Sequence, residues 1–390
     1  MIVVDSTPVK RATVLPVLKR CLRMEDVEVT KDLERQQALF EELHRLVDRP
    51  MRLMVVCGTQ NRAILKYGIR QKLPPMLELV AGPGCSVCVM PAGHIDAFIK
   101  IAKQPKVITA ACEDLIRVPG SNQTLASVWK RGARIEVISS PMDALDIARR
   151  EPDYTVVYPA VGFEATAPSV AETILEAARL GIDNFCVIPS IRLLPPTIDL
   201  LMLDPDLNIR GLLCSDHINT ISDTKAYTEL AKKHHLSCYI AGFEVVDILE
   251  GILSLVKQIR NGESLFDDHS AFMYSSADNR KARKMVSEVF FAVDTDWRGL
   301  GTIEHSGFVI REELSLFDAT KRFNVRFEEG LESCMCQCSA IISGRGLPPD
   351  CPAFGMACTP QSPVGPCMIS DEGICHSYYK YNRQASRVIL

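Results

Sequence analysis

The sequence contains no long hydrophobic run and no large excess of charge of either sign. No apolar stretch approaches the roughly 20 residues that a membrane-spanning helix needs. Forty-four basic residues stand against 48 acidic ones, which gives a net charge of −4. A chain with this charge has no basic field to attract nucleic acid or an anionic membrane. We therefore expect neither nucleic-acid binding nor a membrane protein.

The pattern of a signal peptide is also missing. Asp5 lies near the start, and a short apolar run ends at Lys19 and Arg20, which reverses the order of a secretory signal. We therefore expect a cytoplasmic protein. Hydrophobic residues make up 47% of the chain and charged residues 24%, which is typical of globular proteins, and 390 residues suffice for two or three domains.

Cysteine, by contrast, is abundant. Of 15 cysteines, seven fall within the last 57 residues: Cys334, Cys336, Cys338, Cys351, Cys358, Cys367 and Cys375. Clustered thiols in a reducing compartment are more often metal ligands or redox groups than structural disulfides. Cysteines inside strand-like segments are instead expected to be small core residues. This second group comprises Cys186, Cys214 and Cys238, and less firmly Cys21 and Cys112.

The spacing of apolar residues predicts an α/β fold. Residues 31–49 have helical periodicity, with Leu33, Phe40, Leu43 and Val47 on one face. After Pro50, short and almost continuously apolar runs alternate with helical stretches, as in parallel sheets covered on both faces. The predicted strands are 52–57, 76–82, 106–111, 134–140, 154–162, 185–191, 209–215 and 237–242.

We expect two Rossmann-like parallel-sheet α/β domains followed by a C-terminal iron–sulfur domain. The predicted divisions are an N-terminal helical segment (1–50), α/β domain I (51–138), α/β domain II (139–262) and a C-terminal [4Fe–4S] domain (263–390). From about residue 347 the chain is rich in Pro and Gly and poor in apolar periodicity. Such a segment needs cross-links to hold one conformation, and metal–thiolate bonds could supply them.

Four of the C-terminal cysteines are candidate ligands of an iron–sulfur cluster. Cys338, Cys351, Cys358 and Cys375 are separated by 12, six and 16 residues. Structural zinc sites usually present their cysteines as closely spaced pairs, and these gaps are much wider. Thiolates on separate loops suit a [4Fe–4S] cube, which takes its ligands from several directions. Zinc and plain buried thiols remain alternatives on spacing alone.

Three further segments carry reactive side chains where predicted strands end. Cys85 and Cys88 form a C-x-x-C after Gly-Pro-Gly, which favours a redox-active dithiol over half of a zinc site. Cys57 ends a strand just before a helix, where a thiol serves as nucleophile or soft-metal ligand unless it is merely a core residue. Glu164 and His217 also follow strands, at the edge where open α/β sheets bind ligands.

Several longer motifs resemble one known family. They are CGT at 57–59, GPGC-x-VC at 82–88, RVPGS at 117–121, SPMDALDIAR at 140–149, GFEATAP at 162–168, AGFEVVDILEGI at 241–252, DTDWRGLGTI at 294–303 and CPAFGMACTPQSPVGPCMISDEGICHSYYKY at 351–381. From about Leu53 to Asn382 the chain resembles the HypD hydrogenase maturation factors, whose cluster motif falls on the four cysteines above.

The resemblance implies a scaffold on which one iron acquires two cyanides and a carbon monoxide for [NiFe]-hydrogenase. It implies a HypC-like small chaperone and a HypE-like cyanide donor as partners. Cys57 would then hold the transient Fe(CN)₂CO iron, and a [4Fe–4S] cluster would feed electrons through the Cys85–Cys88 dithiol.

The sequence departs from the family pattern at three places. Gln60 and Arg62 stand where the family has the histidines of CGTH-x-H, Ser86 replaces a proline, and CSDHIN at 214–219 replaces GPGHVS. Each change falls in the expected iron-assembly region. A HypD-like paralogue, an iron–sulfur and dithiol oxidoreductase acting on another substrate, is therefore the alternative.

Overall fold

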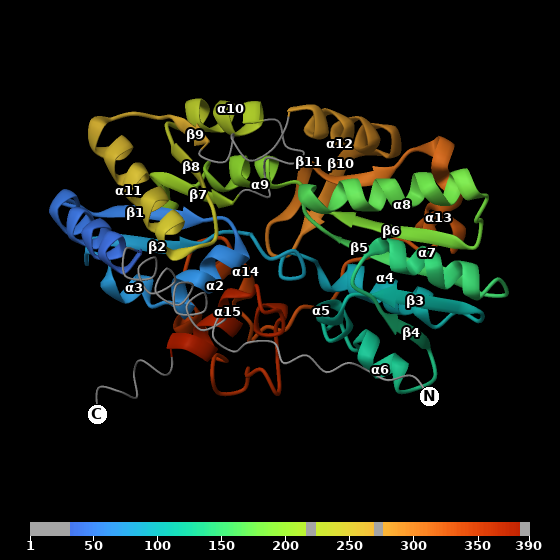
Figure 1. Cartoon of the computed structure of the whole chain (residues 1–390). Coiled ribbons are helices and arrows are strands. Elements are labelled where there is room, and N and C mark those ends of the chain that lie inside the picture. The colour runs from blue at the N-terminus through green and yellow to red at the C-terminus, as the bar shows by residue number, and fades with distance from the viewer. Residues whose placement is uncertain (1–31, 216–223, 269–275, 383–390) are drawn as a thin grey trace, which may run out of the picture.

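The computed structural model describes residues 32–215, 224–268 and 276–382. Two separate parallel sheets form its framework (Figure 1). The first sheet contains, in spatial order, β2 (Leu77–Ala81), β1 (Met51–Val55), β7 (Gly211–Ser215), β8 (Ser237–Ala241) and β9 (Phe266–Asp268). The second sheet contains β4 (Arg134–Val137), β3 (Val107–Ala111), β5 (Thr155–Gly162) and β6 (Phe185–Ile191). The predicted α/β class and all eight predicted strands are confirmed, with ends that shift by a few residues.

Helices cover both sheets, which explains why the strands are apolar on both faces. Around the first sheet lie a helix over residues 32–46, α2 (Gly58–Lys66), α3 (Ile69–Lys72), α9 (Leu194–Leu201), α10 (Thr224–His234) and α11 (Val245–Asn261). Around the second lie α4 (Ala92–Ala102), α5 (Glu113–Ile116), α6 (Leu125–Trp129), α7 (Pro141–Arg150), α8 (Ala167–Leu180) and α12 (Ser276–Val289). No helix in the described ranges is long and apolar enough to cross a membrane.

The amphipathic helix predicted near the N-terminus is present over residues 32–46. Phe40 and Leu43 are buried in the core that this helix shares with α11 and the first sheet, and Val47 is buried just beyond its end. Leu33, which the periodicity places on the same face, is 59% exposed. Its position in the first turn of the described helix leaves it beyond the edge of that core.

The order of strands in space differs from their order along the chain. β1 and β2 pair with β7 and β8, whereas β3 and β4 pair with β5 and β6. Each sheet therefore takes strands from both predicted segments, 51–138 and 139–262. Parallel strands need a crossover connection, and such a connection does not require that paired strands be neighbours in sequence.

An antiparallel hairpin interrupts the predicted C-terminal region. β10 (Phe290–Trp297) and β11 (Gly301–Ile310) pair with each other, and β11 packs beside β6 while α12 packs on α8. The predicted strands did not include this hairpin. β9 also joins the first sheet. Much of the region after residue 262 therefore belongs with the two parallel sheets rather than with the cysteine-rich segment.

The cysteine-rich end of the chain forms turns and very short helices. These include α14 (Cys338–Ile342) and α15 (Ile374–Ser377), whereas α13 (Ala319–Arg322) comes earlier in the chain and contacts β6. In Figure 1 this segment, drawn in red, lies below the first sheet, and α15 packs against α2. A segment with little regular structure is thereby placed next to the carboxyl end of β1.

Candidate functional site

Cys57 lies at the carboxyl end of β1, where it is the residue that precedes the first turn of α2. Its thiol is half-buried and forms a hydrogen bond with Ser215, which ends the neighbouring strand β7. Burial raises the pKa of the Cys57 thiol and nearby Glu372 raises it further, although hydrogen bonds from Ser215 and the backbone of α2 act in the opposite direction. The thiol of the metal-free protein is therefore protonated, and binding a cation there would release the proton.

The turn that carries the C-x-x-C lies against Cys57. The N–H of Gly58 donates to the carbonyl oxygen of Gly84 at 3.2 Å. A Cβ atom on Gly84 would stand 1.6 Å from the carbonyl oxygen of Val56, so only glycine allows this approach. The ends of β1 and β2 are adjacent in the sheet, and the turns that follow them pack backbone to backbone.

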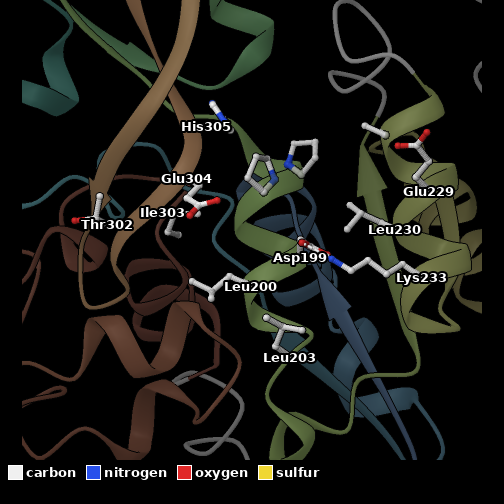
Figure 2. Close-up of a pocket in the computed structure, with 13 residues that line it drawn as sticks. Asp199, Leu200, Leu203, Glu229, Leu230, Lys233, Thr302, Ile303, Glu304 and His305 are labelled. Atoms are coloured by element: carbon white, nitrogen blue, oxygen red, sulfur yellow. Dashed lines mark hydrogen bonds and ion pairs between the residues drawn. The ribbon is translucent and has the colours of Figure 1, made fainter.

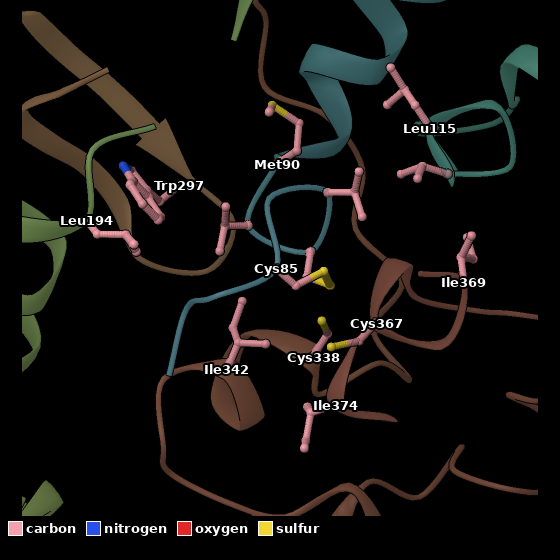
Figure 3. Packing of buried hydrophobic residues seen from close by; sticks show 14 of the residues in the cluster. Cys85, Met90, Leu115, Leu194, Trp297, Cys338, Ile342, Cys367, Ile369 and Ile374 are labelled. Carbon is pink, nitrogen blue, oxygen red and sulfur yellow. A yellow bond between two sulfur atoms is a disulfide. The ribbon is translucent and has the colours of Figure 1, made fainter. Parts of the chain in front are cut away.

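Cys85 and Cys88 are joined by a disulfide. Backbone hydrogen bonds from Cys88 and Val89 to the carbonyl oxygen of Cys85 close the loop between them. Both cysteines are buried, with Cys88 fully enclosed. Figure 3 shows the sulfur of Cys85 directed toward the sulfurs of Cys338 and Cys367. The disulfide therefore lies between the end of the first sheet and the cysteine-rich segment.

Six C-terminal cysteines surround one small cavity. The predicted ligands Cys338, Cys351, Cys358 and Cys375 all line it, together with Cys336 and Cys367. Apolar side chains complete the walls, and the four predicted ligands are at most 7% exposed. The structure thus brings together the four cysteines that the spacing indicated. Cys336 and Cys367 were not predicted to be ligands, although the C-x-C of Cys336 and the loop position of Cys367 are visible in the sequence.

The thiols around this cavity are in contact with one another. Cys336, Cys338, Cys367 and Cys375 form a continuous series of side-chain hydrogen bonds, which the pKa shifts of all four thiols reflect. Within the described part of the chain, no three potential ligands converge as those of a single metal ion do.

The residues present fit a larger metal–sulfur group. The backbone N–H of Val364 donates to the sulfur of Cys358 at 3.3 Å, which is the kind of hydrogen bond that tunes iron–sulfur clusters. A Cβ atom on Gly365 would stand 2.3 Å from the sulfur of Cys336, so this loop must carry glycine to reach the cavity. Since Cys336 and Cys338 both line the cavity, the geometry does not single out either as the first ligand.

Gln60 and Arg62 are both engaged in contacts within the protein. The side-chain amide of Gln60, fully buried, donates to the carbonyl oxygens of Cys214, Ala241 and Gly242 at 2.8 to 3.1 Å. Gln60 thus ties α2 to the ends of β7 and β8. Arg62 pairs at 3.3 Å with Asp371, next to the Glu372 that accepts a hydrogen bond from Thr59 at 3.2 Å. Both side chains, which stand where the family motif has histidines, are therefore held by other parts of the chain.

Glu164 lies at the carboxyl edge of the second sheet, in the turn after β5. Its carboxylate is buried and accepts the N–H of Leu194 at 2.7 Å. Burial raises the pKa of Glu164 to about 7. Burial is the main cause that raises the pKa of the fully buried Tyr227 on α10, and nearby Glu164 and Cys214 raise it further. The two sheet edges thus approach each other there, while His217 lies outside the described residues.

The other cysteines divide as expected, with one correction. Cys186, Cys214 and Cys238 are fully buried, which confirms their assignment to the core, and Cys21 lies outside the described residues. Cys112 is exposed, so its assignment to the core was wrong. It follows the last residue of β3 and begins α5, beyond the covered part of the strand.

A second hollow lies away from these residues. A groove of about 760 Å³ runs between α9, α10 and the start of β11 (Figure 2). On its floor Asp199 pairs with Lys233 at 2.7 Å, and Leu200 and Leu203 form an apolar edge. None of the cysteines lines this groove.

The fold and site define an α/β protein in which a strand-end thiol, a disulfide and a cysteine-lined cavity follow one another. A sequence profile named HypD, described as "Hydrogenase formation hypA family", matches residues 34–382. The chain is 37% identical over 348 residues to "Hydrogenase maturation factor HypD" of Azotobacter vinelandii, covering 87% of this chain and 92% of that protein. It is 35% identical over 360 residues to the protein of the same name from Escherichia coli K12, covering 92% and 96%.

In each comparison the match covers most of this chain and most of the related protein. The chain therefore belongs to the HypD family of hydrogenase maturation factors.

Proposed function

We propose that the protein is a scaffold and redox protein that assembles the Fe(CN)₂CO unit of [NiFe]-hydrogenase. The observation that supports this most is the sequence of sulfur groups from Cys57 through the Cys85–Cys88 disulfide to the cysteine cavity. A metallocentre scaffold needs one thiol to hold the incoming iron and a nearby source of electrons. Cys57 and the Cys85–Cys88 pair, which would fill these two roles, follow the neighbouring strands β1 and β2 of the first sheet.

In this proposal Cys57 binds the iron that is being assembled, which is the substrate. The thiol lies at the end of a strand and at the start of α2, whose first backbone N–H groups face it. Those donors stabilise a thiolate once a cation has displaced the proton. A HypC-like chaperone would supply the second thiol to the same iron, and a HypE-like protein would supply cyanide.

The Cys85–Cys88 pair would supply the electrons for cyanide transfer. Closing the disulfide releases two electrons and two protons. The same two electrons and two protons convert a carrier thiocyanate, R–S–C≡N, into R–SH and HCN, whose proton is lost as cyanide binds iron. An iron–sulfur cluster held by the cavity cysteines would supply one-electron transfer beside this pair. Glu164, with its pKa near neutrality, and His217 are the remaining candidates for proton transfer.

The test is a complementation assay with an infrared readout. The chain is expressed with HypC-like and HypE-like partners in cells that lack their own HypD, and the purified complex is examined for cyanide and carbonyl stretches. Cys57→Ala should abolish both bands and hydrogenase activity. Cys112→Ala is the matched control, because it removes a strand-end cysteine from the other sheet, and it should leave both unchanged. Loss of function in both variants, or in neither, would contradict the role of Cys57.

The second candidate function is an iron–sulfur and dithiol oxidoreductase that acts on another substrate. The environment of Gln60 favours it, because the side chain is fixed by three carbonyl oxygens where the family motif has a histidine. Complementation by the natural sequence is compared with that by Gln60→His/Arg62→His. Activity from the double variant alone supports the paralogue, whereas full activity from the natural chain supports the scaffold.

A further inference from the structure

Arg298 is a buried arginine at the tip of the β10–β11 hairpin. The residue is 7% exposed and follows Trp297, the last residue of β10. Its backbone N–H donates to the carbonyl oxygen of Val89 at 2.8 Å, and its Nε donates to that of Met90 at 2.8 Å. These carbonyls belong to the two residues that directly follow Cys88. One side of Arg298 therefore fixes the end of the disulfide turn.

The other side of the guanidinium faces the cysteine-rich segment. Nη1 forms an ion pair with Glu332, which lies two residues before Cys334 and also accepts the N–H of Ala92 at 2.9 Å. Nη2 is buried and has no hydrogen-bond partner among the residues that the structure describes. A buried donor without a partner lowers the stability of a protein. A group that interacts with Nη2 is therefore expected next to it.

Three thiols of the cavity also lie close enough to Arg298 to interact with its charge. Arg298 interacts electrostatically with Cys336, Cys338 and Cys367, although burial is the largest influence on its pKa and lowers it. A guanidinium keeps its charge at neutral pH even in such surroundings. The side chain of Glu332, the carboxylate that pairs with Arg298, is 43% exposed. Water therefore screens the negative charge of Glu332 more than it screens the positive charge of Arg298.

We propose that Arg298 is a positioning residue that holds the Cys85–Cys88 turn against the cysteine cavity and supplies positive charge to a metal–thiolate group bound there. A buried cation stabilises the more negative state of a neighbouring redox group, because the low dielectric hardly screens it. Arg298 therefore raises the reduction potential of that group and strengthens metal retention. The inference rests on the proposed function only in requiring that the cavity binds metal through thiolates.

The experiment compares Arg298→Gln, Arg298→Lys and Glu332→Gln in anaerobically reconstituted full-length protein, by redox titration followed with paramagnetic resonance. At the midpoint potential of the wild type, Arg298→Gln should show a ratio of reduced to oxidised centres lowered at least roughly tenfold, as loss of a nearby buried charge implies. Arg298→Lys keeps the charge and should lie nearer to the wild type. Glu332→Gln removes the counter-charge but leaves the arginine, so the ratio should rise.

A second readout does not depend on a functional iron centre. The affinity of the reduced, iron-free protein for Zn²⁺ is measured against a chromophoric chelator, and Arg298→Gln should weaken it while Arg298→Lys largely restores it. Equal loss in the two arginine variants would show that hydrogen-bond geometry, and not charge, matters. An unchanged potential in Arg298→Gln would overturn the proposal, and if that variant does not fold, an unchanged or lowered ratio in Glu332→Gln would do so. Neither readout uses hydrogenase activity, so a failed complementation assay leaves this inference standing and tests the proposed function alone.

Discussion

The N–H of Gly58 donates to the carbonyl oxygen of Gly84 at 3.2 Å. This single backbone contact joins the residue after Cys57 to the residue before Cys85. The C-x-x-C turn and the strand-end thiol are therefore joined through adjacent backbone, so a change in one turn would act directly on the other. Glycine is required at both positions, because a Cβ atom on Gly84 would stand 1.6 Å from the carbonyl oxygen of Val56 and one on Gly58 would stand 2.7 Å from that of Glu372.

The cysteine cavity predicts the metal content of the protein. Anaerobically purified protein should be brown and contain about four irons per chain, because four thiolates bind one cube. Cys358→Ser should remove most of the iron, since its sulfur lines the cavity and accepts the N–H of Val364. Exposed Cys334 provides the matched control, and Cys334→Ser should retain full iron content. Stoichiometric zinc without iron in the wild type would show that the cavity holds a different metal.

The same measurement identifies the first ligand. Cys336→Ser and Cys338→Ser are compared for iron content, because both thiols line the cavity while the spacing argument selected only Cys338. We expect one variant to lose iron and the other to keep it. Retention of iron by Cys338→Ser would correct the predicted ligand set to include Cys336.

The disulfide between Cys85 and Cys88 should be redox-active. Labelling of thiols across a titration with glutathione should show a two-electron step within reach of cellular reductants. Cys88→Ala should abolish that step and leave Cys85 permanently available for labelling. Labelling that is independent of potential in the wild type would indicate a purely structural disulfide.

Gln60 should contribute far more to stability than Arg62. Replacing Gln60 by Ala removes the two amide N–H donors that three carbonyl oxygens at the ends of β7 and β8 share, and should lower the free energy of unfolding by roughly 2 to 3 kcal/mol. Arg62→Ala removes a largely exposed ion pair with Asp371 and should cost less than about 1 kcal/mol. Urea unfolding of the two variants side by side measures the difference. Equal effects would mean that the buried amide network contributes little.

Glu164 should make stability fall as pH rises toward neutrality. Its pKa is raised from 4.5 to about 7 in the folded protein, so between these values the folded state binds a proton that the unfolded state has released. The stabilisation is complete below pH 4.5 and is lost as pH rises through 7. Glu164→Gln keeps an acceptor for the N–H of Leu194 and removes this dependence, so it should be more stable than the wild type at pH 8, by up to roughly 3 kcal/mol.

The measurement for Glu164 is urea unfolding at pH 5 and pH 8. The difference between the variant and the wild type should grow with pH. A constant difference would show that the carboxyl group is not protonated in the folded protein near neutrality.

The sequence by itself determined the α/β class, the eight strands and the identity of the main reactive residues. Apolar runs such as 154–162 and 185–191 can only be strands buried on both faces, and strand-end residues such as Cys57 and Glu164 lie at sheet edges by that fact alone. The C-terminal spacing likewise selected cysteines that do share one cavity. These features depend on local periodicity and on residue chemistry, which a single sequence carries.

Only the tertiary structure decided which strands pair with each other and which residues each side chain contacts. The pairing of β1 with β7 depends on a crossover of more than 150 residues, and no local pattern specifies it. In the sequence Gln60 is recognisable only as a replacement for a histidine, whereas in the fold it is buried against the ends of β7 and β8. Arg298 acquires its place between the disulfide turn and the cysteine cavity in the same way. Contacts between distant segments arise from packing of the whole chain, so the sequence could name these residues but could not assign their partners.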